Sequence, residues 1–118
     1  MDNDAALKRL SALAQDSRLA IFRLLVKAGP AGVAAGDIAR ALDTAPNTMS
    51  AQLLVLANAG LVRARRAGRS IIYAVDFSAM SALLVFLTED CCGGRPEICA
   101  PVIASAAACC PPRKSRRA

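Results

Sequence analysis

The chain has 118 residues, 55% of them hydrophobic and 20% charged, with a formal net charge of +6, five cysteines and no histidine. This length indicates one main domain, the near absence of aromatic residues predicts an aliphatic core, and the basic charge favours a polyanionic partner, either nucleic acid or an anionic membrane surface. Without histidine the usual Ser-His and Cys-His pairs are excluded, so we do not expect an enzyme.

The first residues, "MDNDAALKRL", lack the basic and apolar regions of a signal peptide, and the apolar stretches of the chain are too short to span a bilayer. We therefore expect a soluble, cytoplasmic protein with no membrane partner. Thiols stay reduced in that compartment, so five cysteines fit a metal or redox role better than a disulfide framework.

Two helices are predicted before the first Gly-Pro break. Apolar residues recur at helical spacing over 4–14, and a second helix is expected to begin near Asp16, with Asp16 or Ser17 as its N-cap, and to stop at Gly29. The residues of the second helix predicted to point inward are Leu19, Phe22, Leu25 and Val26.

Two short helical segments separated by the turn "TAP" follow. "AAGDIARALD" predicts a helix with Ile38 and Leu42 buried, and "NTMSAQLLVLANAG" predicts another, with Pro46 in its first turn and Gly60 at its end. This spacing is typical of a helix-turn-helix. The predicted inward face of the second segment consists of Met49, Leu53, Leu56 and Ala57.

The polar residues of that second segment are concentrated near its start. In helix-turn-helix proteins the N-terminal end of the second helix enters the major groove, where Asn and Gln side chains suit adenine. We therefore expect Asn47, Thr48, Ser50 and Gln52 to contact DNA, the alternative being ordinary capping and solvent-facing roles.

The next stretch, "LVRARRAGRSIIYAVD", alternates apolar and basic residues and predicts a β-hairpin with strands over 61–66 and 70–75 and a turn at Ala67-Gly68. A helix-turn-helix followed by such a hairpin is a winged helix, whose wing contacts phosphates or the minor groove. The arginines expected on the polar face and tip are Arg63, Arg65, Arg66 and Arg69, and the last three are predicted DNA contacts.

A last helix is expected over 77–88, capped by Asp76 or Ser78, with apolar residues on more than one face. This excess predicts burial between two subunits, which would present two recognition helices to two half-sites one DNA turn apart. The predicted fold is thus mostly α, a winged helix-turn-helix with a small β-hairpin. We expect a DNA-binding and dimerisation domain over 1–90 and a cysteine-containing segment with a basic tail over 91–118.

Four stretches, "SRLAIFRLL", "DIARAL", "NTMSAQLLVLANAGLV" and "RAGRSIIYAVD", together resemble the ArsR/SmtB family of bacterial metalloregulatory repressors over about residues 5 to 88. The resemblance implies a homodimer built through the first and last helices, with double-stranded operator DNA as its partner. The family pattern is matched by Ser50, Leu53, Leu56, Gly60, Leu61 and Val62.

Two inducer sites known in the family are missing from this sequence. "DIARALDTAPN" lacks the thiol pair that some members carry, and the absence of histidine excludes a histidine-based zinc site on the last helix. An inducer site is therefore expected elsewhere, in the stretch "EDCCGGRPEIC".

That stretch contains Cys91, Cys92 and Cys99. Adjacent cysteines, a Gly-Gly turn and a third cysteine can bring three sulfurs together, as a pyramidal trivalent arsenic or antimony centre requires. Zinc would need a fourth ligand, which Cys109 or Cys110 could supply, and a redox role also stays open.

The resemblance to arsenic-responsive members with a C-terminal cysteine triad favours arsenic. We therefore predict an arsenic(III)-responsive transcriptional repressor whose apo dimer is released from its operator by arsenite, with antimonite as a second candidate. The alternatives are a thiol redox sensor or another soft-metal sensor on the same fold, and an architectural DNA-binding protein with incidental cysteines.

Overall fold

The computed structural model describes residues 1–88, 97, 100–102 and 104–105. The chain divides into two compact units, Met1–Phe86 and Leu87–Ala118. In the second unit, Glu97 and residues 100–102 and 104–105 have helical backbone and exposed side chains. A functional boundary between residues 90 and 91 stays a prediction. No helix within the described ranges has the length and apolar character needed to cross a bilayer.

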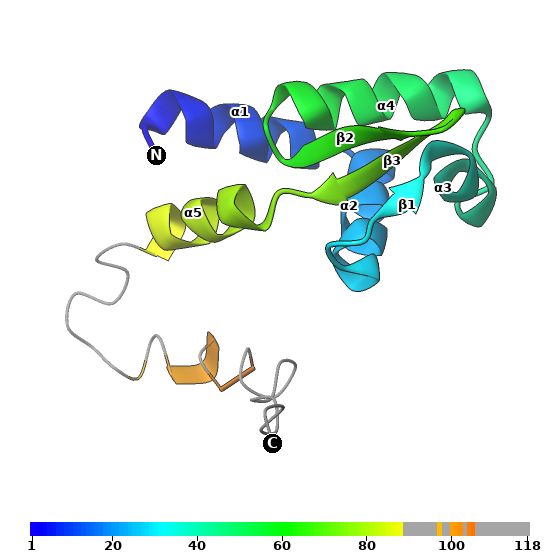
Figure 1. Ribbon diagram of the computed structural model, residues 1–118. Helices are drawn as coiled ribbons and strands as arrows, with labels where there is room; N and C mark the ends of the chain where they lie inside the picture. The colour runs from blue at the N-terminus through cyan, green and yellow to red at the C-terminus, as the bar shows by residue number, and fades with distance from the viewer. Residues whose placement is uncertain (89–96, 98–99, 103, 106–118) are drawn as a thin grey trace. The chain divides into compact units, whose positions relative to one another are not determined.

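The first unit packs α-helices around a small antiparallel sheet (Figure 1). The order of helices and hairpin is the predicted winged helix-turn-helix, with one short strand added. The elements are α1 (Asn3–Leu13), α2 (Asp16–Ala28), β1 (Val33–Ala34), α3 (Ala35–Ala41), α4 (Pro46–Asn58), β2 (Val62–Ala67), β3 (Ser70–Val75) and α5 (Phe77–Thr88).

The added strand, β1, corrects the sequence analysis, which predicted no strand here and placed Ala34 at the start of the next helix. The sheet order is β1-β3-β2, and β1 pairs Val33 with Tyr73. Two residues are too few to show an alternating pattern in the sequence, so only the pairing with β3 identifies this strand. A Cβ on Gly32 would lie 2.6 Å from the carbonyl oxygen of Tyr73, and Gly32 has φ +76°. Glycine therefore permits the close approach of β1 to β3.

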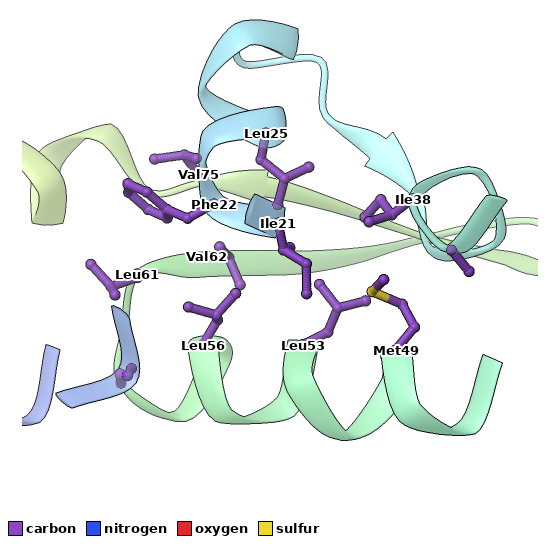
Figure 2. Close-up of a cluster of buried hydrophobic side chains, with 13 residues drawn as sticks. Ile21, Phe22, Leu25, Ile38, Met49, Leu53, Leu56, Leu61, Val62 and Val75 are labelled. Carbon is purple, nitrogen blue, oxygen red and sulfur yellow. The ribbon is translucent and has the colours of Figure 1, made fainter. Parts of the chain in front are cut away.

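The core lies between α2, α4 and the sheet (Figure 2). Leu19, predicted to point inward, is 44% exposed, whereas Ile21 is 1% exposed. The two residues are about 200° apart around a helix, so the inward face of α2 is centred on Ile21 and Leu25 rather than on Leu19. The largest side chains that are fully buried are Ile21, Leu25, Ile38, Met49, Leu53, Leu56 and Leu61, as expected for an aliphatic core.

The N-cap of α2 is Gln15, not Asp16 or Ser17. The Gln15 side-chain oxygen accepts a hydrogen bond from the backbone N–H of Arg18 at 3.0 Å. A capping side chain must precede the helix to reach its third N–H, and Asp16 is already helical. Asp16 instead places a negative charge in the first turn, where the helix dipole favours it.

The C-terminal end of α4 confirms the predicted stop at Gly60, which has φ +83°. The Gly60 N–H donates to the Ala57 carbonyl at 3.0 Å, and the Leu61 N–H donates to the Leu56 carbonyl at 3.1 Å. These two bonds form a Schellman motif, and Leu56 and Leu61 both belong to the core cluster. The glycine thus ends the helix and directs the chain into β2.

Candidate nucleic-acid interface

The start of α4 is polar, exposed and uncapped. Asn47, Thr48 and Ser50 are exposed, and within the described residues their side chains make no hydrogen bond. The N-cap position, Ala45, provides no side-chain hydrogen bond, and Pro46 occupies the first turn. The free N–H groups of this turn and the positive end of the helix dipole are therefore available to an anionic group such as a phosphate.

Gln52, predicted with these three residues as a DNA contact, differs from them. It is half-buried, and its Oε1 accepts a hydrogen bond from Arg18 Nη1 at 2.9 Å. A bidentate contact to adenine needs both the oxygen and the nitrogen of the amide. The Gln52 amide oxygen already accepts from Arg18, so this arrangement favours a contact within the protein over a bidentate contact to a base.

The wing arginines do not share one polar face, which corrects the sequence analysis. Side chains alternate between the two faces of a strand, so Arg63 and Arg65 of β2 lie on one side and Arg66 on the other. Arg63 Nε donates to Asp76 Oδ2 at 3.0 Å, and Arg65 Nη2 donates to the Ala31 carbonyl at 2.9 Å. Arg63 and Arg65 are thus both hydrogen-bonded to other residues of the protein.

Arg66 and Arg69 are exposed, and neither has a hydrogen-bond or ion-pair partner among the described residues. Arg69 lies in the turn, which consists of Gly68 and Arg69 because Ala67 still pairs with Ser70. The predicted turn was therefore one residue early. The turn between β2 and β3 lies at the same end of the first unit as the start of α4 (Figure 1).

Asp76 connects the wing to the last helix. Its Oδ1 accepts a hydrogen bond from the Ala79 N–H at 3.1 Å, which confirms Asp76 as the cap of α5. That hydrogen bond, assisted by the Arg63 guanidinium, lowers the pKa of the Asp76 carboxyl below its ordinary 3.8.

Two arginines that the sequence analysis did not single out join α1 to α4. Arg9 Nε donates to the Ala59 carbonyl at 3.1 Å, and Arg18 Nε donates to the Ala12 carbonyl at 2.6 Å. Their acceptors are mainly backbone carbonyls, which leave no trace in the side-chain pattern. In the sequence both arginines therefore look like ordinary solvent-facing positions of amphipathic helices.

The three cysteines of the predicted inducer site, Cys91, Cys92 and Cys99, lie outside the described residues, as do Cys109 and Cys110. Among the residues that are described, no three His, Cys, Asp or Glu side chains are grouped closely enough to hold a metal ion.

Known proteins resemble the first unit in sequence and structure. A helix-turn-helix domain family matches residues 13–65. The HTH-type transcriptional regulator NmtR of Mycobacterium tuberculosis is 41% identical over 87 residues, covering 71% of this chain and 70% of that protein.

Solved structures agree with that match. The homodimeric winged helix-turn-helix DNA-binding domain of Mb0332 from Mycobacterium bovis, a possible ArsR-family regulator, is 33% identical with a TM-score of 0.59, covering 74% of this chain and 81% of that one. The AntR antimony-specific transcriptional repressor is also 33% identical, with a TM-score of 0.54 over 66% of this chain and 69% of its own.

Proposed function

Since the chain belongs to the ArsR family of winged helix-turn-helix transcriptional regulators, we propose that it is a homodimeric repressor that binds operator DNA and is released by trivalent arsenic. In this proposal the protein acts in the cytoplasm, where its thiols stay reduced and the DNA is accessible.

The observation that supports DNA binding is the combination of an exposed, uncapped start of α4 with unpaired arginines at the wing tip. Asn47, Thr48 and Ser50 would contact base edges and phosphates in the major groove, while Arg66 and Arg69 would contact the flanking backbone. Arg65 would add a phosphate contact through the N–H groups not directed at Ala31.

The homodimer is supported by apolar side chains that the first unit leaves exposed on its first and last helices. Leu7 and Leu10 of α1 are 56% and 37% exposed, and Leu84 of α5 is 53% exposed although the same helix buries Ala79 and Leu83. Such a surface is typical of a subunit interface. The related Mb0332 domain is homodimeric, which points the same way.

The inducer site that we propose consists of Cys91, Cys92 and Cys99. In this reaction three thiols displace the three hydroxyl groups of arsenous acid, forming three As–S bonds and releasing three waters, so no oxidant is needed. Soft thiolates suit a soft trivalent centre, and the related AntR is an antimony-specific repressor, so antimonite is the second inducer to test.

Release from DNA requires that the inducer bind the free dimer more tightly than the DNA-bound one. Couplings of about 1–3 kcal/mol are typical, and a shift from 99:1 to 1:99 takes about 5.5 kcal/mol. Two inducer sites per dimer would together supply the larger figure. The coupling is reciprocal, so operator DNA should weaken arsenite binding by the same factor.

The inducer test is fluorescence anisotropy of the reduced protein on its upstream promoter DNA, titrated with arsenite and, in parallel, antimonite. We expect arsenite to release the wild type and the control variant Cys109→Ser/Cys110→Ser, but not Cys91→Ser, Cys92→Ser or Cys99→Ser. Release by peroxide, reversed by dithiothreitol, in place of release by arsenite would instead establish the thiol redox sensor.

The DNA-binding test compares Arg66→Ala/Arg69→Ala with Arg23→Ala/Lys27→Ala, which removes two exposed charges from α2. Each lost phosphate contact should reduce the slope of log K against log salt by about 0.9. The wing variant removes two arginines from each protomer of the dimer, so its slope should fall by about 3.6, while that of the control should hardly change. Equal slopes for both variants would show that the wing does not contact DNA.

A further inference from the structure

Two arginine side chains link α1 to α4 at separate points along α4, in addition to the core cluster that Ala12 shares with Leu56 and Ala59. Arg9, a half-buried residue of α1, donates from Nε to the carbonyl of Ala59, the C-cap residue of α4. The last carbonyls of a helix have no partner within the helix and carry the negative end of its dipole, so a guanidinium there is well placed. A Cβ added to Gly60 would lie 3.1 Å from Arg9 Nη2, so the guanidinium also lies close to the Schellman turn.

Arg18 makes the second connection and involves three elements. From the first turns of α2, its Nε donates to the Ala12 carbonyl in the last turn of α1 at 2.6 Å, and its Nη1 donates to Gln52 Oε1 of α4 at 2.9 Å. A planar guanidinium presents several N–H groups in a fixed arrangement, so one side chain can bridge two acceptors whose directions differ. Ala12 is itself buried, at 4% exposed.

The two connections meet α4 at residues 52 and 59, which lie about 10 Å apart along a helix axis. The core already packs α4 against α2 and the sheet. Two polar connections at separate points add a constraint on both the position and the direction of the α4 axis relative to α1, which one connection alone would not. The exposed residues that we assign to the major groove, Asn47, Thr48 and Ser50, lie on the part of α4 beyond the second connection.

We propose that Arg9 and Arg18 are positioning residues that set which half-site spacing the repressor accepts, with Gln52 serving as the acceptor for Arg18 rather than as a base-reading residue. This inference rests on the proposed function, in which α1 contributes to the dimer interface and each α4 reads one half-site. The separation of the two recognition helices is then transmitted from the interface through α1 and these arginines. DNA half-sites have a fixed separation, so two tightly held helices tolerate one spacing and loosely held helices tolerate several.

The test uses variants that keep the charge. In Arg9→Lys/Arg18→Lys one ammonium cannot reproduce the bridge from Ala12 to Gln52, yet the net charge and its attraction for DNA are unchanged. The matched control is Arg23→Lys, an exposed arginine of the same helix as Arg18 that has no hydrogen-bond partner in the described part of the chain. Each protein is titrated onto the operator, onto operators whose half-sites are moved by one or two base pairs, and onto a single half-site.

We expect the wild type and Arg23→Lys to lose about tenfold or more in affinity when the spacing is changed, because two-site binding is lost when the geometry forbids it. The double variant should bind the native spacing more weakly, should lose most of this discrimination, and should keep its affinity for the single half-site. Gln52→Met, which removes the acceptor alone, should shift the spacing profile in the same direction without changing half-site affinity.

Three outcomes would overturn the inference. One is an unchanged spacing profile in the double variant, and another is an equal loss of affinity on every DNA, including the single half-site, which would indicate a general loss of structure. The third is a loss of half-site affinity in Gln52→Met, which would make Gln52 a base-reading residue. If the wild type itself shows no dependence on spacing, the proposed dimeric repressor is wrong, and that failure is separate from the others.

Discussion

At the scale of single residues, Asp76 shows how one carboxylate serves two elements. Oδ1 caps α5 through the Ala79 N–H, and Oδ2 accepts from Arg63 of the wing at 3.0 Å. The Asp76 side chain is 17% exposed, whereas that of Arg63 is 75% exposed. The cap is therefore the more protected of the two interactions, and the ion pair is screened by solvent.

Asp76→Asn should separate these roles, because an amide caps a helix about as well but carries no charge. We expect a loss of less than about 1 kcal/mol in the free energy of unfolding at pH 7. The folded-state pKa of Asp76 is lowered, so the charged carboxylate stabilises the fold fully above the ordinary value of 3.8, and this contribution disappears as pH falls through the lowered pKa.

Urea unfolding of wild type and variant at pH 7, 5 and 3 measures the difference. The gap between the two proteins should be similar at pH 7 and 5 and should narrow toward pH 3. Asp37→Asn, which removes an exposed ion pair with Arg40 on α3, is the control for a surface pair. A gap that widens on acidification would show that the charge does not stabilise the fold.

Residue identity alone predicted which side chains belong to the wing but not what each one binds. The four arginines between residues 63 and 69 are equivalent in the sequence, yet two are bonded to the body and two are unpaired within the described chain. Gln52 was grouped with Asn47 because both are amides near the start of a helix. The distinction depends on Arg18, which is distant in the sequence, and no local pattern encodes that contact.

At the scale of elements, the C-terminal end of α4 combines a backbone turn with a contact to another helix. The Schellman turn at Gly60 ends α4 where Arg9 binds its last carbonyl, so the glycine conformation and the arginine contact occupy the same place. A side chain at residue 60 would disturb both.

Gly60→Ala should lower the free energy of unfolding by about 1–2 kcal/mol, the cost of a left-handed conformation for an L-residue, plus the cost of displacing Arg9. In an Arg9→Lys background the second cost should shrink, which a double-mutant cycle in urea measures. Gly29→Ala is the control, since nothing lies within 4 Å of its added Cβ and its cost should be equal in both backgrounds. Strict additivity of Gly60→Ala with Arg9→Lys would contradict the contact.

The helices and the hairpin were predictable because periods of 3.6 and 2 persist over many residues and because Gly, Pro and Asp mark their ends. β1 was not predictable, since its two residues acquire strand geometry only by pairing with β3. The cap at Gln15 was missed because Asp and Ser, the commoner caps, stand directly after it.

At the scale of the whole molecule, the exposed leucines of α1 are the surface most directly tied to assembly. Leu7 is 56% exposed, and Leu54 on the outer face of α4 is 58% exposed. Both residues are exposed leucines, but in the proposed function α1 lies in the dimer interface and α4 is the recognition helix.

Leu7→Glu should therefore weaken self-association by about tenfold or more, because it buries a charge in the interface, while Leu54→Glu should leave it unchanged. Sedimentation velocity over a range of protein concentrations measures the monomer–dimer equilibrium, and circular dichroism checks that both variants keep their helices. Equal effects of the two substitutions would show that α1 is not in the interface.

The short strand β1 also determines where the protein opens first. The β2–β3 hairpin closes through a two-residue turn, whereas β1 pairs with a strand that is distant in the sequence and is joined to it by only two residue pairs. β1 should therefore form late during folding and exchange its amide hydrogens by local opening, without unfolding of the core. Such an opening moves the Ala31 carbonyl that holds Arg65, so transient fraying at this edge of the sheet would loosen the wing while the recognition helix stays in place.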